Sequence, residues 1–152
     1  MNTSTDEKII NAFLTGSVKG LIESNKRAEH IQTQISHIFL YTTTAYKLYR
    51  RDNEGFNKGF VNLADETTRA KFYKEDFFYN HYFNPAVYQQ LQKIKISGND
   101  IELKNKDDVG DDWVIQMRRI DTARNLTTLL HANILHADDF RKIGYQMTKA
   151  VA

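Results

Sequence analysis

Two strand-like segments, each interrupted by a short turn, constrain this chain to an antiparallel sheet. The segment "KIKISGNDIELK" (93–104) alternates about Ser-Gly-Asn-Asp and places Ile94 and Ile96 opposite Ile101 and Leu103. The segment "ISHIFLYTTTAYKLYR" (35–50) joins two runs rich in β-branched and aromatic residues through Tyr-Thr-Thr-Thr. Both segments predict hairpins.

The hairpin of residues 35–50 carries a lysine in an otherwise apolar arm. Because side chains alternate faces along a strand, Tyr46 and Leu48 share one face, and Lys47 lies on the other with Ala45 and Tyr49. A lysine on a sheet face is most often simply solvated. A specific role for Lys47 requires a partner from another part of the chain.

A long helix is predicted between the two hairpins. In "ETTRAKFYKEDFFYNHYF" (66–83) apolar residues recur at a spacing of three to four, and Asn84-Pro85 should end the helix. Glu75 and Asp76 lie near its middle. If this helix crosses the sheet face that carries Lys47, one of these carboxylates can meet the ammonium group.

The other segments complete an α+β pattern. Residues 6–29 have helical spacing, weakened at Gly16 and Gly20, and predict one broken helix or two short ones. The segment 113–120 predicts a fifth strand, and 122–152 predicts two helices. We therefore expect one domain with a mostly antiparallel sheet of about five strands, a packed helix, and helices at both ends of the chain.

Composition narrows the possible functions. The chain has 152 residues, no cysteine and a net charge of +2 with scattered basic residues. Disulfides and thiolate sites are thereby excluded, and no basic strip indicates nucleic acid. No apolar run is long enough for a membrane span, and the N-terminus has no secretory signal pattern, so a cytoplasmic protein is expected.

Three short motifs have simpler explanations than catalysis. "GSVKG" (16–20) misplaces the lysine of a phosphate-binding loop and falls within a helical pattern. The five histidines form no HExxH pair, so no metal site is predicted. "HADD" (136–139) contains a catalytic-type His-x-Asp, but an aspartate there is better explained as the N-cap of the last helix.

Four segments follow one another along the chain: "HIQTQISHIFLYTTTAYKLYR" (30–50), "GFVNL" (59–63), "FYKEDFFYNHYFNPAVY" (72–88) and "WVIQMRRID" (113–121). In order and spacing they resemble the N-terminal lobe of a bacterial branch of the aminoglycoside phosphotransferase-like kinases. That branch has a hairpin written HISxVFLTGxxAYKxKK, then GFLDF, a helix with EExxLN that ends in APxxY, and a strand that ends in VxMRR. The resemblance covers residues 32–121.

The resemblance implies an ATP site. Lys47 corresponds to the phosphate-binding lysine and Glu75 to its helix partner, with Asp76 as the next candidate. The turn over the phosphates corresponds to Thr42, Thr43 and Thr44, and the adenine hinge to Gln116, Met117 and Arg118. Residues 1–31 then form an N-terminal helical segment, 32–121 the kinase-like lobe, and 122–152 helices that lead toward a second lobe, which would hold most of the magnesium.

Two functions remain open from the sequence. No HGDxxxxN catalytic loop occurs in the chain, so this chain alone is expected to be inactive, whether it is a piece of a longer kinase or a single lobe. The first function is ATP binding in a phosphotransferase whose acceptor is a small molecule. The alternative is a non-enzymatic module that binds a partner or forms a homodimer through apolar residues such as Tyr145, Met147 and the tyrosines before Pro85.

Overall fold

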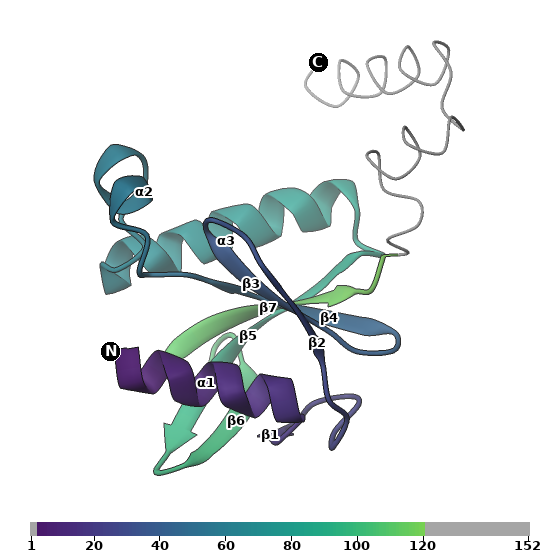
Figure 1. Ribbon diagram of the computed structural model, residues 1–152. Helices are drawn as coiled ribbons and strands as arrows, with labels where there is room; N and C mark the ends of the chain where they lie inside the picture. The colour runs from purple at the N-terminus through teal and green to yellow at the C-terminus, as the bar shows by residue number, and fades with distance from the viewer. Residues whose placement is uncertain (1–2, 121–152) are drawn as a thin grey trace, which may run out of the picture. The chain divides into compact units, whose positions relative to one another are not determined.

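The structure is a computed structural model that describes residues 3–120, with secondary structure assigned from Thr3 onward (Figure 1). The chain divides into two units, Met1–Arg119 and Ile120–Ala152, and the ten assigned helices and strands belong to the first. In chain order they are α1 (Thr3–Thr15), β1 (Val18–Lys19), β2 (Glu29–Gln32), β3 (Ser36–Leu40), β4 (Thr44–Tyr49), α2 (Glu54–Gly59), α3 (Glu66–Phe83), β5 (Tyr88–Ser97), β6 (Asp100–Asn105) and β7 (Asp112–Arg118). The fold is α+β, as predicted.

The sheet has seven strands, so the predicted number of five was wrong. Its order is β1-β6-β5-β7-β4-β3-β2, in which only the β1–β6 pair of the described strands is parallel. Both predicted hairpins, β3–β4 and β5–β6, are present. The two additional strands lie at the edges: β1 falls within the segment predicted to be helical, and β2 lies just before the first hairpin.

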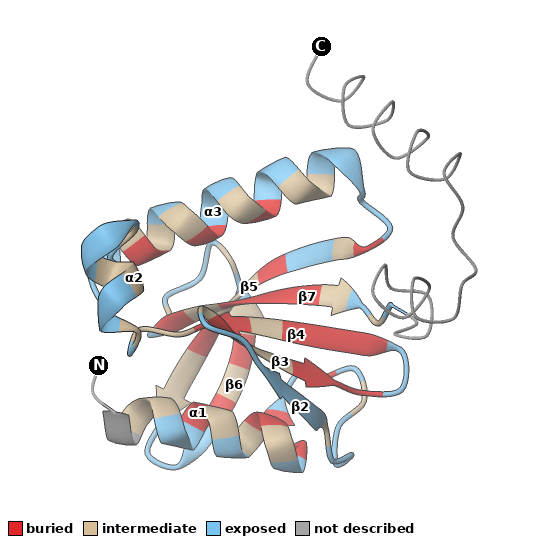
Figure 2. Ribbon diagram, turned by 45° about the horizontal axis from the view of Figure 1, so that its top comes forward, coloured by how far each residue is buried: buried red, intermediate tan, exposed pale blue. Residues whose placement is uncertain are grey.

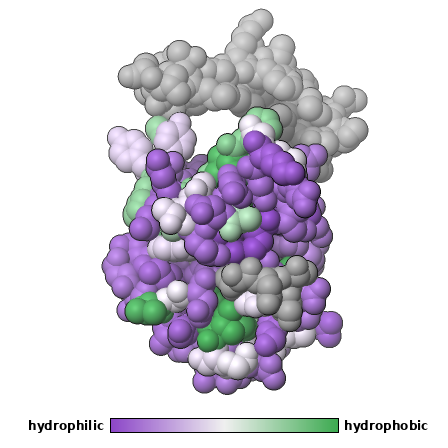
Figure 3. All heavy atoms as spheres, turned by 90° about the vertical axis from the view of Figure 1, so that its left-hand side faces the viewer, coloured by the Kyte–Doolittle hydropathy of each residue, from purple (hydrophilic) through white to green (hydrophobic). Residues whose placement is uncertain are grey.

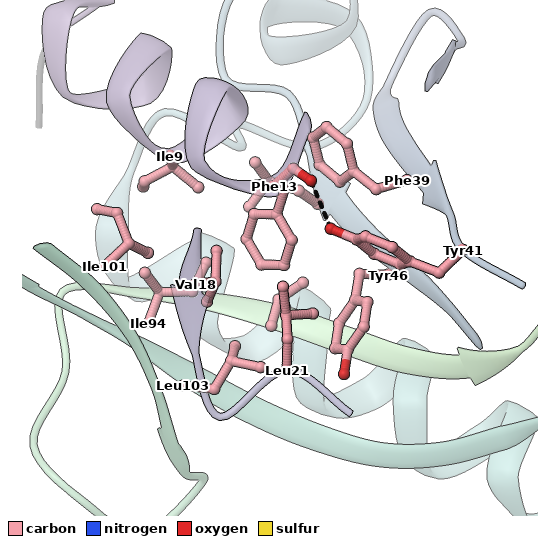
Figure 4. Packing of buried hydrophobic residues seen from close by; sticks show 12 residues of the cluster. Ile9, Phe13, Val18, Leu21, Phe39, Tyr41, Tyr46, Ile94, Ile101 and Leu103 are labelled. Atoms are coloured by element: carbon pink, nitrogen blue, oxygen red, sulfur yellow. Dashed lines mark hydrogen bonds between the residues drawn. The ribbon is translucent and has the colours of Figure 1, made fainter. Parts of the chain in front are cut away.

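Helices cover both faces of the sheet (Figure 2). On one face, Ile9 and Phe13 of α1 pack with Tyr46 and Leu48 of β4 in one buried cluster, part of which is drawn in Figure 4. On the other face a second cluster joins α3 to the strands: Tyr49, Leu63, Tyr73, Phe77, Leu91 and Ile115. The alternation predicted for 45–49 is therefore confirmed, since Tyr46 and Leu48 face α1 while Tyr49 faces α3.

The first helix ends at a glycine for a steric reason. Gly16 has φ +73°, and a Cβ atom at this position would lie 2.3 Å from the carbonyl oxygen of Lys26. The close approach lets the chain turn from α1 into β1. The hydroxyl of Tyr41 donates a hydrogen bond to the carbonyl oxygen of Phe13, which ties the last turn of α1 to the sheet (Figure 4).

The long helix α3 has the predicted extent. The Asp65 side chain accepts hydrogen bonds from the backbone N–H and the hydroxyl of Thr68, at 2.9 and 2.7 Å, and so caps the N-terminus. The helix ends at Phe83 with Asn84 as its C-cap, directly before Pro85, which confirms the predicted stop. The segment between β4 and α3 contains the short helix α2, which is capped by Asn53.

The surface of the described part offers no membrane-spanning element. Among the described residues, every helix is too short or too polar to traverse a bilayer. The face shown in Figure 3 is mostly hydrophilic, with small and separated hydrophobic areas.

Candidate functional site

Lys47 lies in the interior of the sheet. It belongs to β4, which pairs with β3 on one side and β7 on the other, and its neighbours across the two ladders are Ile38 and Ile115. Its side chain points toward the α3 face and is 19% exposed. A lysine in this position needs a charge partner, because burial without one is costly.

The partner is Asp76 of α3, whose carboxylate lies 3.8 Å from the Lys47 ammonium group. Two further groups hold this carboxylate: the hydroxyl of Tyr49 donates a hydrogen bond to Oδ2, and the side-chain amide of Asn80 donates one to Oδ1 at 2.9 Å. The Lys47 ammonium also lies 5.0 Å from the centre of the Tyr49 ring. These four residues form the candidate site.

Glu75 is not the partner of Lys47. Its side chain is 67% exposed and forms an i,i+4 pair with Lys71 at 3.8 Å. Adjacent helix positions differ by about 100°, so only one of two neighbouring carboxylates can face the sheet. The first-choice residue from the resemblance is therefore displaced by Asp76, which was the second.

Burial sets the electrostatics of the site. Removal from water lowers the pKa of Lys47, and the Asp76 carboxylate opposes this shift. Burial, reinforced by the hydrogen bond to Asp76, raises the pKa of the Tyr49 hydroxyl. Tyr49 therefore remains a proton donor to the carboxylate at all physiological pH values.

The threonine turn holds an internal carboxylate. One oxygen of Glu23 accepts hydrogen bonds from the backbone N–H of Thr43 at 3.1 Å, and from the N–H and hydroxyl of Thr44 at 3.3 and 2.8 Å. Although desolvation acts in the opposite direction, these bonds and one from Thr42 lower the pKa of Glu23. The turn binds an anion, and in this structure that anion is Glu23.

The expected adenine hinge lies in paired backbone. Gln116, Met117 and Arg118 belong to β7, which is bonded to β4 on one edge and β5 on the other. The N–H of Arg118 donates to the carbonyl oxygen of Val87 at 2.9 Å, and the Gln116 side chain donates to that of Gln89 at 3.1 Å. The strand is thus paired on both edges at these positions, and the role of the three residues as an adenine hinge stays a prediction.

Besides the Lys47–Asp76 pair, a buried cluster of charged residues joins the first part of α3 to the sheet. Arg69, with its side chain 1% exposed, donates to both oxygens of Asp112 at 2.8 and 3.2 Å and to the carbonyl oxygen of Tyr49 at 2.7 Å. Arg51 also binds Asp112, at 2.8 Å. Arg69 therefore fixes α3 against the end of β4 and holds Asp76 over Lys47.

The sequence analysis placed Tyr49 on the sheet face of Lys47 but assigned neither Tyr49 nor Asn80 nor Glu23 to the site. Asn80 lies four residues after Asp76, a spacing that brings side chains together on one helix face and could have indicated the contact. Tyr49 shares the sheet face of Lys47 two positions away, which is also readable from the sequence. Glu23 contacts a turn twenty residues later in the chain, and no local pattern indicates that.

The described residues contain no group of three or more His, Cys, Asp or Glu side chains suited to hold a metal ion. The predictions for Tyr145, Met147, the "HADD" motif and the helices of 122–152 lie outside the described residues.

Comparisons with protein-family models, with curated proteins and with solved structures give no match to this chain. The site therefore rests on its own geometry: a strand lysine, largely buried, held by a helix carboxylate.

Proposed function

We propose that this chain is the ATP-binding lobe of a phosphotransferase that acts on small molecules, similar to the aminoglycoside phosphotransferase-like kinases. The observation that carries the proposal is the contact of Lys47 in the sheet interior with Asp76 of the covering helix. A lysine held in this way presents a fixed positive charge to the α- and β-phosphates of a nucleotide. The hairpin, helix and strand that carry the resemblance supply β4, α3 and β7.

The residues of the candidate site fit the triphosphate of ATP better than they fit a magnesium ion. Lys47 keeps one face of its ammonium group away from Asp76, and the 19% exposure of its side chain leaves a path for a phosphate oxygen. Magnesium prefers carboxylate oxygens and waters, and the described part gathers no cluster of three metal-binding side chains. We therefore assign nucleotide binding to this lobe and no turnover, in keeping with the missing HGDxxxxN loop.

In this proposal the turn of Thr42, Thr43 and Thr44 contacts phosphate only after Glu23 has left it. Its amides already bind the Glu23 carboxylate, so a phosphate group would have to displace Glu23 to use them. The adenine is not assigned to Gln116, Met117 and Arg118, because their strand is paired on both edges.

The proposal is tested with variants at Lys47, at its partner Asp76 and at the adjacent Glu75, which does not contact Lys47. We expect Lys47→Met to weaken ATP binding by about tenfold or more, since it removes a charge-assisted contact. Asp76→Asn should weaken it less, and Glu75→Gln should leave it unchanged. Binding is measured by isothermal titration calorimetry with ATP, and circular dichroism shows whether each variant folds.

Equal binding by wild type and Lys47→Met would remove Lys47 from the site. A loss with Glu75→Gln that matches the loss with Asp76→Asn would show that the Lys47–Asp76 geometry is not what matters. Lys71→Met is the charge-matched control for Lys47→Met, because it removes an exposed lysine from α3.

A second candidate function is association through the end of α3. Four large aromatic side chains there are 46–80% exposed: Phe78, Tyr79, Tyr82 and Phe83. Contiguous exposed apolar surface of this kind marks interfaces in folded proteins. Sedimentation velocity over a range of concentrations tests it: a dimer that Tyr82→Ser weakens and ATP does not affect would favour this function.

A further inference from the structure

A groove runs along the flank of α3 that is opposite to Asp76. Its floor is formed by Trp113 of β7, which lies beneath two lysines from different elements. The ammonium group of Lys74 in α3 is 5.4 Å from the centre of the Trp113 ring, and that of Lys93 in β5 is 4.8 Å from it. Two cations thus flank the ring of one partly buried indole.

The groove extends beyond the indole. The hollow at Trp113 measures about 450 Å³ and is also lined by Phe78, Leu91 and Lys106. These three residues line a second hollow as well, of about 230 Å³, which continues toward His81. The two hollows therefore form one elongated depression between α3 and the β5–β6 hairpin, with an apolar floor and lysines at its rim.

Positive charge at the rim exceeds what the local acids neutralise. Among the described residues, neither Lys74 nor Lys93 has a carboxylate oxygen within 4.0 Å, and Lys93 donates to the backbone carbonyl of Asp108 at 2.7 Å. Of the three lysines that line the hollow at Trp113, Lys106 has an acidic partner, Asp107 at 3.2 Å, and Asp107 is the one carboxylate among the residues that line this hollow. The groove therefore presents unpaired cations beside an exposed apolar surface that includes Phe78, half of which is accessible.

We infer that this groove binds an acidic peptide segment of a partner protein, with an aromatic side chain of the peptide packed on the exposed ring of Phe78 beside Trp113. The elongated shape suits an extended chain, and its apolar floor accepts an aromatic anchor. Carboxylates on either side of that anchor would meet Lys74, Lys93 and Lys106. This surface is independent of the Lys47 site, because Asp76 lies on the other flank of α3.

The only tryptophan of the chain reports on the groove directly. The probe is an acetylated and amidated pentapeptide, Asp-Glu-Phe-Asp-Glu, titrated into the full chain while Trp113 fluorescence is recorded. We expect a saturable change that weakens as salt rises from 50 to 500 mM, because the rim contacts are exposed and screened. Lys74→Gln and Lys93→Gln should each weaken binding by about threefold.

Three controls define the outcome. Lys58 is an exposed lysine on α2, and Lys58→Gln should leave the affinity for the peptide unchanged. Saturation of the protein with ATP should leave that affinity unchanged as well. A pentapeptide with serine in place of phenylalanine should bind at least tenfold more weakly. The inference is overturned if no saturable change occurs, if Lys58→Gln matches the groove variants, or if phenyl phosphate binds as tightly as the peptide, which would make this a small-molecule site.

Discussion

Asp112 shows how strongly a single buried charged residue can affect the stability of the fold. It accepts hydrogen bonds from both Arg69 and Arg51, and its side chain is 1% exposed. Burial also raises the pKa of nearby Asp6 in spite of Arg51. Such clusters do not by themselves stabilise a fold, but a missing member leaves an uncompensated charge inside it.

We predict that Asp112→Asn lowers the free energy of unfolding by about 3–5 kcal/mol, because among the described residues Asp112 is the carboxylate that is hydrogen-bonded to the buried Arg69. Asp52→Asn is the matched control: its pair with Arg50 at 2.8 Å is exposed, with 67% of the Asp52 side chain accessible, and should matter by less than about 1 kcal/mol. Urea denaturation of both variants measures the difference. Similar losses in the two would contradict the role given to Asp112.

The paired histidines predict an acid-sensitive fold. His30 and His37 are joined by a hydrogen bond of 3.0 Å between ring nitrogens, and burial, followed by the nearby charges of His30 and Arg50, lowers the pKa of His37 to about 4. The unfolded chain binds this proton near pH 6.5, so the folded state loses stability as pH falls from there toward 4.

His37→Gln should therefore lose less stability between pH 7 and pH 4.5 than wild type does. The comparison uses the change in urea midpoint for each protein, so any constant cost of the substitution cancels. An equal or larger loss in the variant would assign the acid sensitivity to other groups.

At the scale of elements, Gly16 fixes where α1 stops. Gly16→Ala should destabilise the fold by more than about 2 kcal/mol, because a Cβ at this position would meet the Lys26 backbone at 2.3 Å and φ is +73°. Gly98→Ala is the control, since φ is +63° there but no atom lies within 4 Å of the added Cβ. Thermal unfolding should show a clearly larger drop for Gly16→Ala, and the reverse order would contradict this account.

The elements that the sequence predicted well are those with strong local signals. The hairpins β3–β4 and β5–β6 follow period-two alternation and turn residues, and α3 has a proline-bounded end. The strands β1 and β2 were missed because they have two and four residues, too few for a periodic signal. Their strand conformation depends on pairing with β6 and β3, which are distant or separated by a turn.

The candidate site was predictable only in part. Alternation placed Lys47 on the correct sheet face, and the helix was known to carry two adjacent carboxylates. The choice between Glu75 and Asp76 depends on the rotation of α3 about its axis, which Arg69, Tyr73 and Phe77 fix through burial. The weak amphipathic pattern of this helix, with exposed Phe78 and Tyr79 next to buried Phe77, obscured that rotation.

At the scale of the whole described unit, one sheet separates two cores. Strand β4 contributes Tyr46 and Leu48 to one and Tyr49 to the other. Loss of either core should therefore destabilise the same structure. We predict that Phe13→Ala and Phe77→Ala each cost about 3–5 kcal/mol and shift a single common transition.

The measurement compares urea curves recorded by far-ultraviolet circular dichroism and by Trp113 fluorescence. Coincident curves with an unchanged slope in both variants are expected. Two separated transitions in either variant would show that the cores unfold independently.

The two ends of the sheet differ in a way that bears on the behaviour of the protein at high concentration. The β1 edge consists of a two-residue strand that includes exposed Lys19, which leaves little backbone for another chain to pair with. The β2 edge is longer and fully exposed, and it carries Glu29 and His30 beside Ile31. Intermolecular strand addition, whether in aggregates or in fibrils, should therefore start at β2, and a proline or a second charge at Ile31 is the substitution with which an engineer would seek better solubility.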